Sequence, residues 1–361
     1  MNKSEIILIW FSYNDISFAR AEQFLSKFDD YDMLFDKNNI KNAVFNDIHL
    51  NDIKEKLLKD DLERFEDKII NELYKYNLTA ITYNSKNYPE KLKDIADPPL
   101  VLYVRGDASL LNKKSISIVG TRKPTDYGKI VTEKFVRELS GAGLVTVSGL
   151  AYGIDTIVAK STLDAGGKTI AVLAGGLDVI YPSQNKALAE RIVETGGLIL
   201  SEARPKQKPL QFAFISRNRI VSALGLGTLI VEAGKHSGTM TTARCALEQG
   251  RELFVVPGNI YCPQSEGTNN LINEIPDSFT ISPDRILYKL KIKKKVQAEK
   301  QDIQVDTSES QILQALSKKE LTFDELCEIT GILPGELSAN LIKLEMFGLV
   351  KKGDANTYFK L

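Results

Sequence analysis

The chain has 361 residues, of which 43% are hydrophobic and 26% charged, as is usual for soluble proteins of two or three domains. Its 47 basic and 47 acidic residues cancel, which argues against a uniformly basic surface. The three cysteines lie far apart, which argues against disulfides and structural zinc. Without a signal-peptide core or about 18 consecutive apolar residues, a cytoplasmic protein with no membrane span is expected.

The first 76 residues lack glycine and show helical spacing with acidic solvent faces, as in DISFARAEQFLSKF and DIKEKLLKDDLERFEDKIINELYKY. They predict a small helical (SAM-like) domain over residues 1–76. Residues 1–80 hold 11 basic and 16 acidic side chains, so this part is not expected to bind DNA. From LTAITYNSKNYPEKLKDIADPPLVLYVRGD onward the pattern becomes extended.

Residues 77–288 repeat one unit, in which a β-branched run precedes a turn of small residues and an amphipathic helix. The runs are SISIVG (115–120), LVTVSG (144–149), TIAVLAGG (169–176), LILSE (198–202), TLIVEA (228–233) and ELFVVPG (252–258). This alternation predicts an α/β domain, a Rossmann-like, mostly parallel sheet with helices on both faces. The loops after the strands then share one edge and form a crevice.

The last part of the chain is divided by a polar stretch at 289–308, KLKIKKKVQAEKQDIQVDTS, which predicts a linker. Residues 309–361 show three helical segments followed by a hairpin pattern, which predicts a winged-helix domain. We expect Gly348 to end the third helix and GDAN to turn the wing. PGELSANLIKLEMFG carries Glu336 and Glu345 against Lys343 alone, so a protein contact is at least as reasonable as DNA for that helix.

The loops after the predicted strands carry small polar and cationic residues suited to an anion. Backbone amides, helix N-termini and guanidinium groups can hold phosphate there. Ser237 is expected to cap the helix that follows KHSGT. The candidates from these loops are Thr121, Arg122, Lys123, Ser148, Gly149, Gly175, Gly176, Ser183, Asn185, Lys186 and Ser237.

FISRNRIV sets two arginines inside an apolar run. If Arg217, Asn218 and Arg219 begin the helix RIVSALG, the two arginines lie about 200° apart around its axis. One arginine is therefore expected to face the crevice and the other a carboxylate, with either assignment open. Phe214 could offer a base a stacking face, or could be a core phenylalanine.

Signatures of nucleotide and catalytic sites are absent or misplaced. AGGKT (165–169) lacks the earlier glycine of a phosphate-binding loop, and no GxGxxG opens a helix. His236 beside Ser237 is poorly placed for a triad, and no metal motif is present. We therefore expect a binding protein with no catalytic residues, metal or cofactor.

Eight ordered motifs resemble the DNA-processing protein A family (DprA, also called Smf). They are IADPPLVLYVRGD, SIVGTR, VSGLAYGID, TIAVLAGGLDVIYP, SRNRI, VEAGKHSGTMTTA, GRELFVVPGN and GTNNLI, and they span about residues 80–280. The resemblance implies a non-enzymatic single-stranded DNA binder that dimerises through the Rossmann-like domain. It also implies loading of the RecA recombinase onto incoming strands during natural transformation.

The resemblance places DNA contacts in the GTR loop, the SGLA loop, the GGLD to YP segment, RNR and SGT. The last of these adds Gly238 and Thr239 to the candidates. Three motifs depart from the family: Val158 and Ala159 replace Ala-His, Ile215 replaces the proline of FPxRNR, and Ser183 stands where some members carry lysine.

Two other functions are kept beside this one. GLGTLIVEAG (225–234) is similar to loops of small-molecule nucleotide binders and phosphoribohydrolases, for which Glu232 would be the catalytic candidate. The second alternative is a scaffold protein that is recruited through its winged helix and has only residual affinity for DNA.

Overall fold

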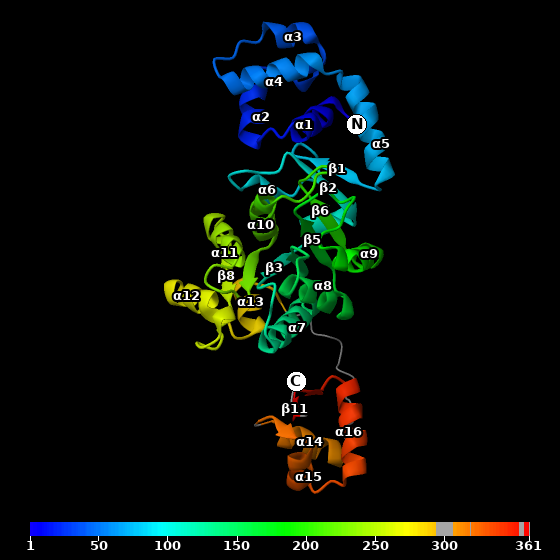
Figure 1. Ribbon diagram of the computed structural model, residues 1–361, viewed down its shortest axis with the longest axis vertical. Coiled ribbons are helices and arrows are strands. Elements are labelled where there is room, and N and C mark those ends of the chain that lie inside the picture. The colour runs from blue at the N-terminus through cyan, green and yellow to red at the C-terminus, as the bar shows by residue number, and fades with distance from the viewer. Residues whose placement is uncertain (294–305, 318, 354–356, 361) are drawn as a thin grey trace. The chain divides into compact units, whose positions relative to one another are not determined.

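The structure is a computed structural model that describes residues 1–293, 306–317, 319–353 and 357–360 (Figure 1). The chain divides into two compact units, residues 1–295 and 296–361. The domain boundary predicted at residue 76 lies inside the first unit, where the helical segment and the sheet pack together. Most of the predicted linker, residues 294–305, lies outside the described residues.

The first part of the chain is helical, as its spacing predicts. An Asp61 N-cap, whose carboxylate accepts from the Glu63 and Arg64 amides, divides the long stretch at 52–76 into two helices. The apolar run Ile6–Phe11 lies in the first helix and is completely buried. The helices here are α1 (Lys3–Tyr13), α2 (Phe18–Leu25), η1 (Tyr31–Phe35), α3 (Lys37–Asn42), α4 (Ile48–Lys59) and α5 (Leu62–Lys75).

An eight-stranded sheet forms the centre of the first unit, with the order β1-β2-β6-β5-β4-β3-β7-β8. The six strands predicted from the β-branched runs are all present and pair in parallel. The extended segment after residue 77 adds β1 and β2 as an antiparallel edge. The strands are β1 (Thr79–Thr82), β2 (Val101–Gly106), β3 (Ser115–Val119), β4 (Val145–Ser148), β5 (Thr169–Leu173), β6 (Leu198–Ser201), β7 (Gly227–Ile230) and β8 (Glu252–Val255).

Helices cover both faces of this sheet, so the predicted fold class is confirmed. One buried cluster joins the sheet to α10 and α11, and another joins it to α7, α8 and α13. Residues of α1 share a buried cluster with Val101 and Tyr103 of β2. Figure 1 shows α1 next to β1 and β2. The remaining elements are α6 (Glu90–Lys93), η2 (Ala108–Asn112), α7 (Asp126–Gly141), α8 (Ile154–Asp164), η3 (Ser183–Asn185), α9 (Lys186–Glu194), α10 (Gln211–Leu224), α11 (Thr239–Glu248), η4 (Pro263–Ser265), α12 (Glu266–Glu274), η5 (Pro276–Ser278) and α13 (Pro283–Lys289).

The second unit has the predicted winged-helix pattern of three helices and a hairpin. Ile312, Leu326 and Leu337 are buried in its core. Gly348, at φ +66°, follows the third helix as expected, since glycine adopts this left-handed conformation readily. The GDAN turn lies mostly outside the described residues. The elements are α14 (Thr307–Ala315), β9 (Leu321–Thr322), α15 (Phe323–Thr330), α16 (Pro334–Met346), β10 (Val350–Lys352) and β11 (Thr357–Lys360).

Candidate functional site

The order of the strands marks one crevice in the sheet. From β3 the chain adds β4, β5 and β6 on one side, and then β7 and β8 on the other. The loops after β3 and β7 therefore leave the sheet in opposite directions, and ligands of open α/β sheets bind at such a switch point. A pocket of about 1060 Å³ opens there.

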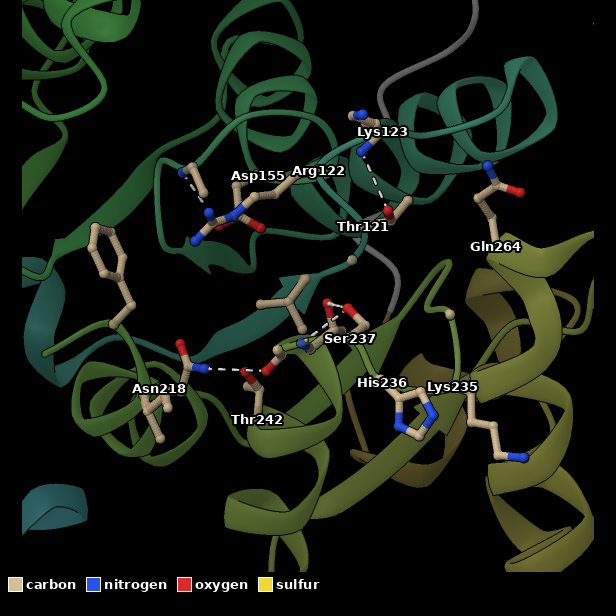
Figure 2. Close-up of a pocket in the computed structure, with 18 of the residues that line it drawn as sticks. Thr121, Arg122, Lys123, Asp155, Asn218, Lys235, His236, Ser237, Thr242 and Gln264 are labelled. Atoms are coloured by element: carbon tan, nitrogen blue, oxygen red, sulfur yellow. Dashed lines mark hydrogen bonds between the residues drawn. The ribbon is translucent and has the colours of Figure 1, made fainter. Parts of the chain in front are cut away.

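This crevice pocket gathers loops that are far apart in the sequence. Figure 2 shows Thr121, Arg122 and Lys123 on one side, with Asn218, Thr242 and Ser237 across from them. The lining residues are Val119, Gly120, Thr121, Arg122, Lys123, Ala151, Asp155, Gln211, Phe214, Ile215, Arg217, Asn218, Gly234, Lys235, His236, Ser237, Gly238, Thr239, Thr242, Pro263, Gln264 and Glu266. Four are cationic side chains and two are carboxylates, so the pocket favours an anion.

The loop after β3 is anchored by the buried Glu232 and exposes two cationic side chains, Arg122 and Lys123. Glu232 is 1% exposed, and its carboxylate accepts hydrogen bonds from the backbone amide and hydroxyl of Thr125. The Thr121 amide donates to the Glu232 carbonyl at 2.8 Å. Arg122 and Lys123 are exposed, and within the described residues neither forms an ion pair. Glu232 thus positions the loop, and its buried carboxylate is not available to a substrate.

Arg217 lies inside the protein beneath the crevice pocket. It is 7% exposed, and its Nη1 donates to the carbonyl oxygens of Gly149, at 2.7 Å, and Val172. The buried Asp155 carboxylate accepts from the Gly149 amide at 3.1 Å. Burial lowers the pKa of Arg217 and raises that of Asp155, and each opposite charge counteracts the shift. Arg217 therefore ties the end of β5 to the loop after β4.

Arg219 points to carboxylates on the other side of the same helix. Its Nη2 lies 2.7 Å from Glu202 and 3.1 Å from Asp97. The two arginines therefore lie on different sides of the helix, as predicted, and Arg219 meets the acids. Arg217 lines the crevice pocket, but it is buried and its Nη1 is occupied by backbone carbonyls. The predicted helix start is wrong, however. α10 begins at Gln211, so the RNR triplet lies in mid-helix, because the apolar residues from Phe212 onward continue the helical pattern.

Two aromatic rings, Phe214 and Tyr181, lie near Arg122 at the crevice pocket. The Arg122 guanidinium lies over the Phe214 ring, 5.5 Å from its centroid. The Tyr181 ring contacts Phe214 edge-on, with 5.7 Å between centroids. Phe214 is therefore a crevice residue in contact with both the Arg122 guanidinium and the Tyr181 ring.

The KHSGT loop brings a helix N-terminus to the crevice pocket. α11 begins at Thr239 with Gly238 as its N-cap, so the prediction that Ser237 is the cap is wrong. The Ser237 hydroxyl accepts from the Thr239 amide at 3.2 Å and donates to the Thr239 hydroxyl. This turn orients the first amides of the helix, where partial positive charge favours an anion.

Nine of the seventeen predicted residues line the crevice pocket. They are Thr121, Arg122, Lys123, Phe214, Arg217, Asn218, Ser237, Gly238 and Thr239. The structure does not bring the other eight into its lining, and they are Ser148, Gly149, Gly175, Gly176, Ser183, Asn185, Lys186 and Arg219.

Several of these eight have structural contacts. The buried Ser148 hydroxyl donates to the Ile118 carbonyl, and the buried Asn185 amide donates to the Leu150 carbonyl. Gly176 donates its amide to the Gln207 carbonyl at 2.9 Å. Ser183 and Lys186 are exposed at η3 and the start of α9.

Sequence reasoning missed part of the pocket wall. Gln211 belongs to the first turn of α10, and Gln264 and Glu266 come from η4 and the start of α12. Only a correct helix start for α10 could have indicated Gln211. The described residues form no cluster of three or more groups able to hold a metal ion. In the same part of the chain no helix is both long and apolar enough to cross a bilayer.

Comparison with known proteins gives the family. The model of the DNA recombination-mediator protein A family matches residues 79–291, and that of the DprA winged helix domain matches residues 296–355. The chain belongs to the DNA recombination-mediator protein A family. The DNA processing protein DprA of Bacillus subtilis is 41% identical over 240 residues, which cover 65% of this chain and 80% of that protein.

Two solved DprA structures share the fold of this family member. The Streptococcus pneumoniae structure has a TM-score of 0.62 at 33% identity, over 70% of this chain and 86% of that one. The Helicobacter pylori structure has a TM-score of 0.54 at 34% identity, over 59% of this chain and 95% of that one. The latter was described for the single-stranded DNA binding mode of that protein.

Proposed function

We propose that the protein binds single-stranded DNA in the crevice pocket and acts as a non-enzymatic recombination mediator. The observation that carries this is the pair of exposed cations Arg122 and Lys123 at the switch point of the sheet, which line the same pocket as the N-terminus of α11. Phosphates would contact these cations and the loop amides, while Phe214 offers a ring to a base. The single-stranded DNA binding of the Helicobacter pylori relative supports the same proposal.

The wider role that we propose follows from family membership. The protein would act in the cytoplasm as a homodimer formed through the Rossmann-like domain and would load RecA onto incoming strands during natural transformation. Light scattering of the purified protein tests the dimer. RecA filament formation on strands already covered by single-strand binding protein, with and without this protein, tests the loading.

A binding assay on labelled oligonucleotides tests the central proposal. The protein should bind a single strand more tightly than a duplex of the same length, with little sequence preference and a strong decrease as salt rises. Equal affinity for the two forms, or binding insensitive to salt, would contradict the proposal.

The structure supports the nucleotide-hydrolase alternative less well than DNA binding. Its catalytic candidate, Glu232, is buried beneath the loop after β3 and is occupied by Thr125. Release of free base from nucleoside monophosphates would reopen it.

A further inference from the structure

A second pocket, of about 380 Å³, lies on the other face of α10. It opens at the carboxyl ends of β5 and β6, beside Leu173 and Ser201, and the loop between α1 and α2 closes one side. Arg217 borders this second pocket as well as the crevice pocket. α10 is therefore a partition between two cavities at one edge of the sheet.

The first two turns of α10 carry exposed apolar side chains on this partition. Phe212 is 65% exposed and Ile215 is 54% exposed. At 100° per residue they lie about 60° apart around the helix axis, so they form one apolar ridge. Phe212 lines the second pocket and Ile215 the crevice pocket, so the ridge joins the two cavities.

The second pocket has polar groups suited to the edge of a base. Arg219 lines it, and among the described residues its buried Nη1 has no hydrogen-bond partner, although Nη2 is paired. The Asp15 and Glu202 carboxylates, which also line this pocket, fit an amino group of a base. The volume lies in the range of about 300–1,000 Å³ that small-molecule sites occupy.

We propose that a strand held in the crevice pocket crosses α10 with its bases stacked on Phe212 and Ile215, and that the second pocket takes a following base. The inference rests on the proposed function. Unpaired bases fit better than a protein partner because the ridge continues the Arg122 and Phe214 contact of the crevice pocket, and the exposed Lys208 lies just before it. Cations interleaved with stacking faces are the usual surface of single-strand binders.

The test compares variants on two fluorescent oligothymidylates, of 4 and 20 nucleotides, at low salt. The 4-mer should occupy only the crevice pocket, whereas the 20-mer should also reach the ridge. Phe212→Ala should weaken binding of the 20-mer by about 5- to 100-fold, because each base stacked on an aromatic ring contributes strongly to the binding free energy. The affinity for the 4-mer should be unchanged. Phe212→Tyr keeps a ring and should bind like the wild type.

The matched control removes an exposed ring elsewhere. Tyr288 on α13 is 85% exposed and lines neither pocket, so Tyr288→Ala should bind both oligonucleotides like the wild type. A 20-mer with abasic sites beyond its first four nucleotides should bind the wild type as weakly as Phe212→Ala binds the intact strand.

Three outcomes would overturn the inference. Unchanged 20-mer binding by Phe212→Ala, with the wild type binding well, refutes the ridge while leaving the proposed function intact. Loss of self-association with unchanged DNA affinity would show that the ridge is an interface between copies. Failure of the wild type to bind either oligonucleotide would refute the proposed function and this inference together.

Discussion

The cations of the crevice differ sharply between its floor and its rim. The floor holds Arg217, which is buried and bonded to two carbonyls, with Arg219 paired to two carboxylates behind it. The rim holds Arg122 and Lys123, which are exposed and form no ion pair within the described residues. Residue type alone therefore does not identify a phosphate contact. A guanidinium whose donors are occupied by the protein still contributes positive potential, but it has few donors left to bond a phosphate.

The largest expected effect is on the floor. Arg217→Ala should lower the free energy of unfolding by about 3–5 kcal/mol, because it leaves the buried Asp155 carboxylate without its opposite charge. Urea unfolding measures this. The double variant with Asp155→Asn should recover part of this lost stability. An Arg217→Ala protein as stable as the wild type would mean that Arg217 contributes no more to stability than an exposed residue of the rim.

Arg219→Ala should have the next effect on stability. Its partners Glu202 and Asp97 remain partly exposed, so we expect a loss of about 1–2 kcal/mol in the free energy of unfolding. Thermal unfolding measures it. A loss as large as that of Arg217→Ala would remove the distinction between the buried pair and the partly exposed one.

The rim should show the opposite behaviour. Arg122→Ala should weaken single-stranded DNA binding about 10-fold and reduce the salt slope by about 0.7, as expected for one lost phosphate contact. Its unfolding should be unchanged, because Arg122 is exposed. Arg137→Ala, an exposed arginine of α7 outside the pocket, is the control. An Arg122→Ala protein that binds like the wild type would refute this placement.

The smallest effect is expected from the winged-helix unit. In α16, Lys343 is engaged by the buried Glu309 at 2.6 Å, which leaves Glu336 and Glu345 without a free cation on that helix. A chain truncated after Lys293 should therefore bind single strands within about 2-fold of the full chain. A 10-fold loss in a titration of labelled oligonucleotide would assign part of the interface to this unit.

Most of the fold could be predicted because its signals are local. The β-branched runs mark the six parallel strands, and the switch to helical spacing marks the helices between them. The antiparallel edge of β1 and β2 was foreseen only as extended chain, because strand direction depends on pairing with β6, far away in sequence. The sequence predicts a start of α10 at Arg217, whereas the helix begins at Gln211, because the apolar residues from Phe212 onward continue the helical pattern.

The site was only half predictable. Thr121, Arg122 and Lys123 follow directly from their place after β3, whereas Gln264 and Glu266 reach the pocket through the packing of α12. Ser148 and Asn185 have the right chemistry for a phosphate, but their donors are occupied by the Ile118 and Leu150 carbonyls. No local pattern reports such competition between a ligand and the protein's own backbone.

The sequence by itself determined the alternating architecture, the crevice at the strand ends and the 200° separation of Arg217 and Arg219, because these depend on local periodicity and helix geometry. Only the tertiary structure decided which arginine is buried against Asp155 and which meets Glu202. That choice depends on where β4, β5 and β6 end around α10, and long-range packing sets those positions.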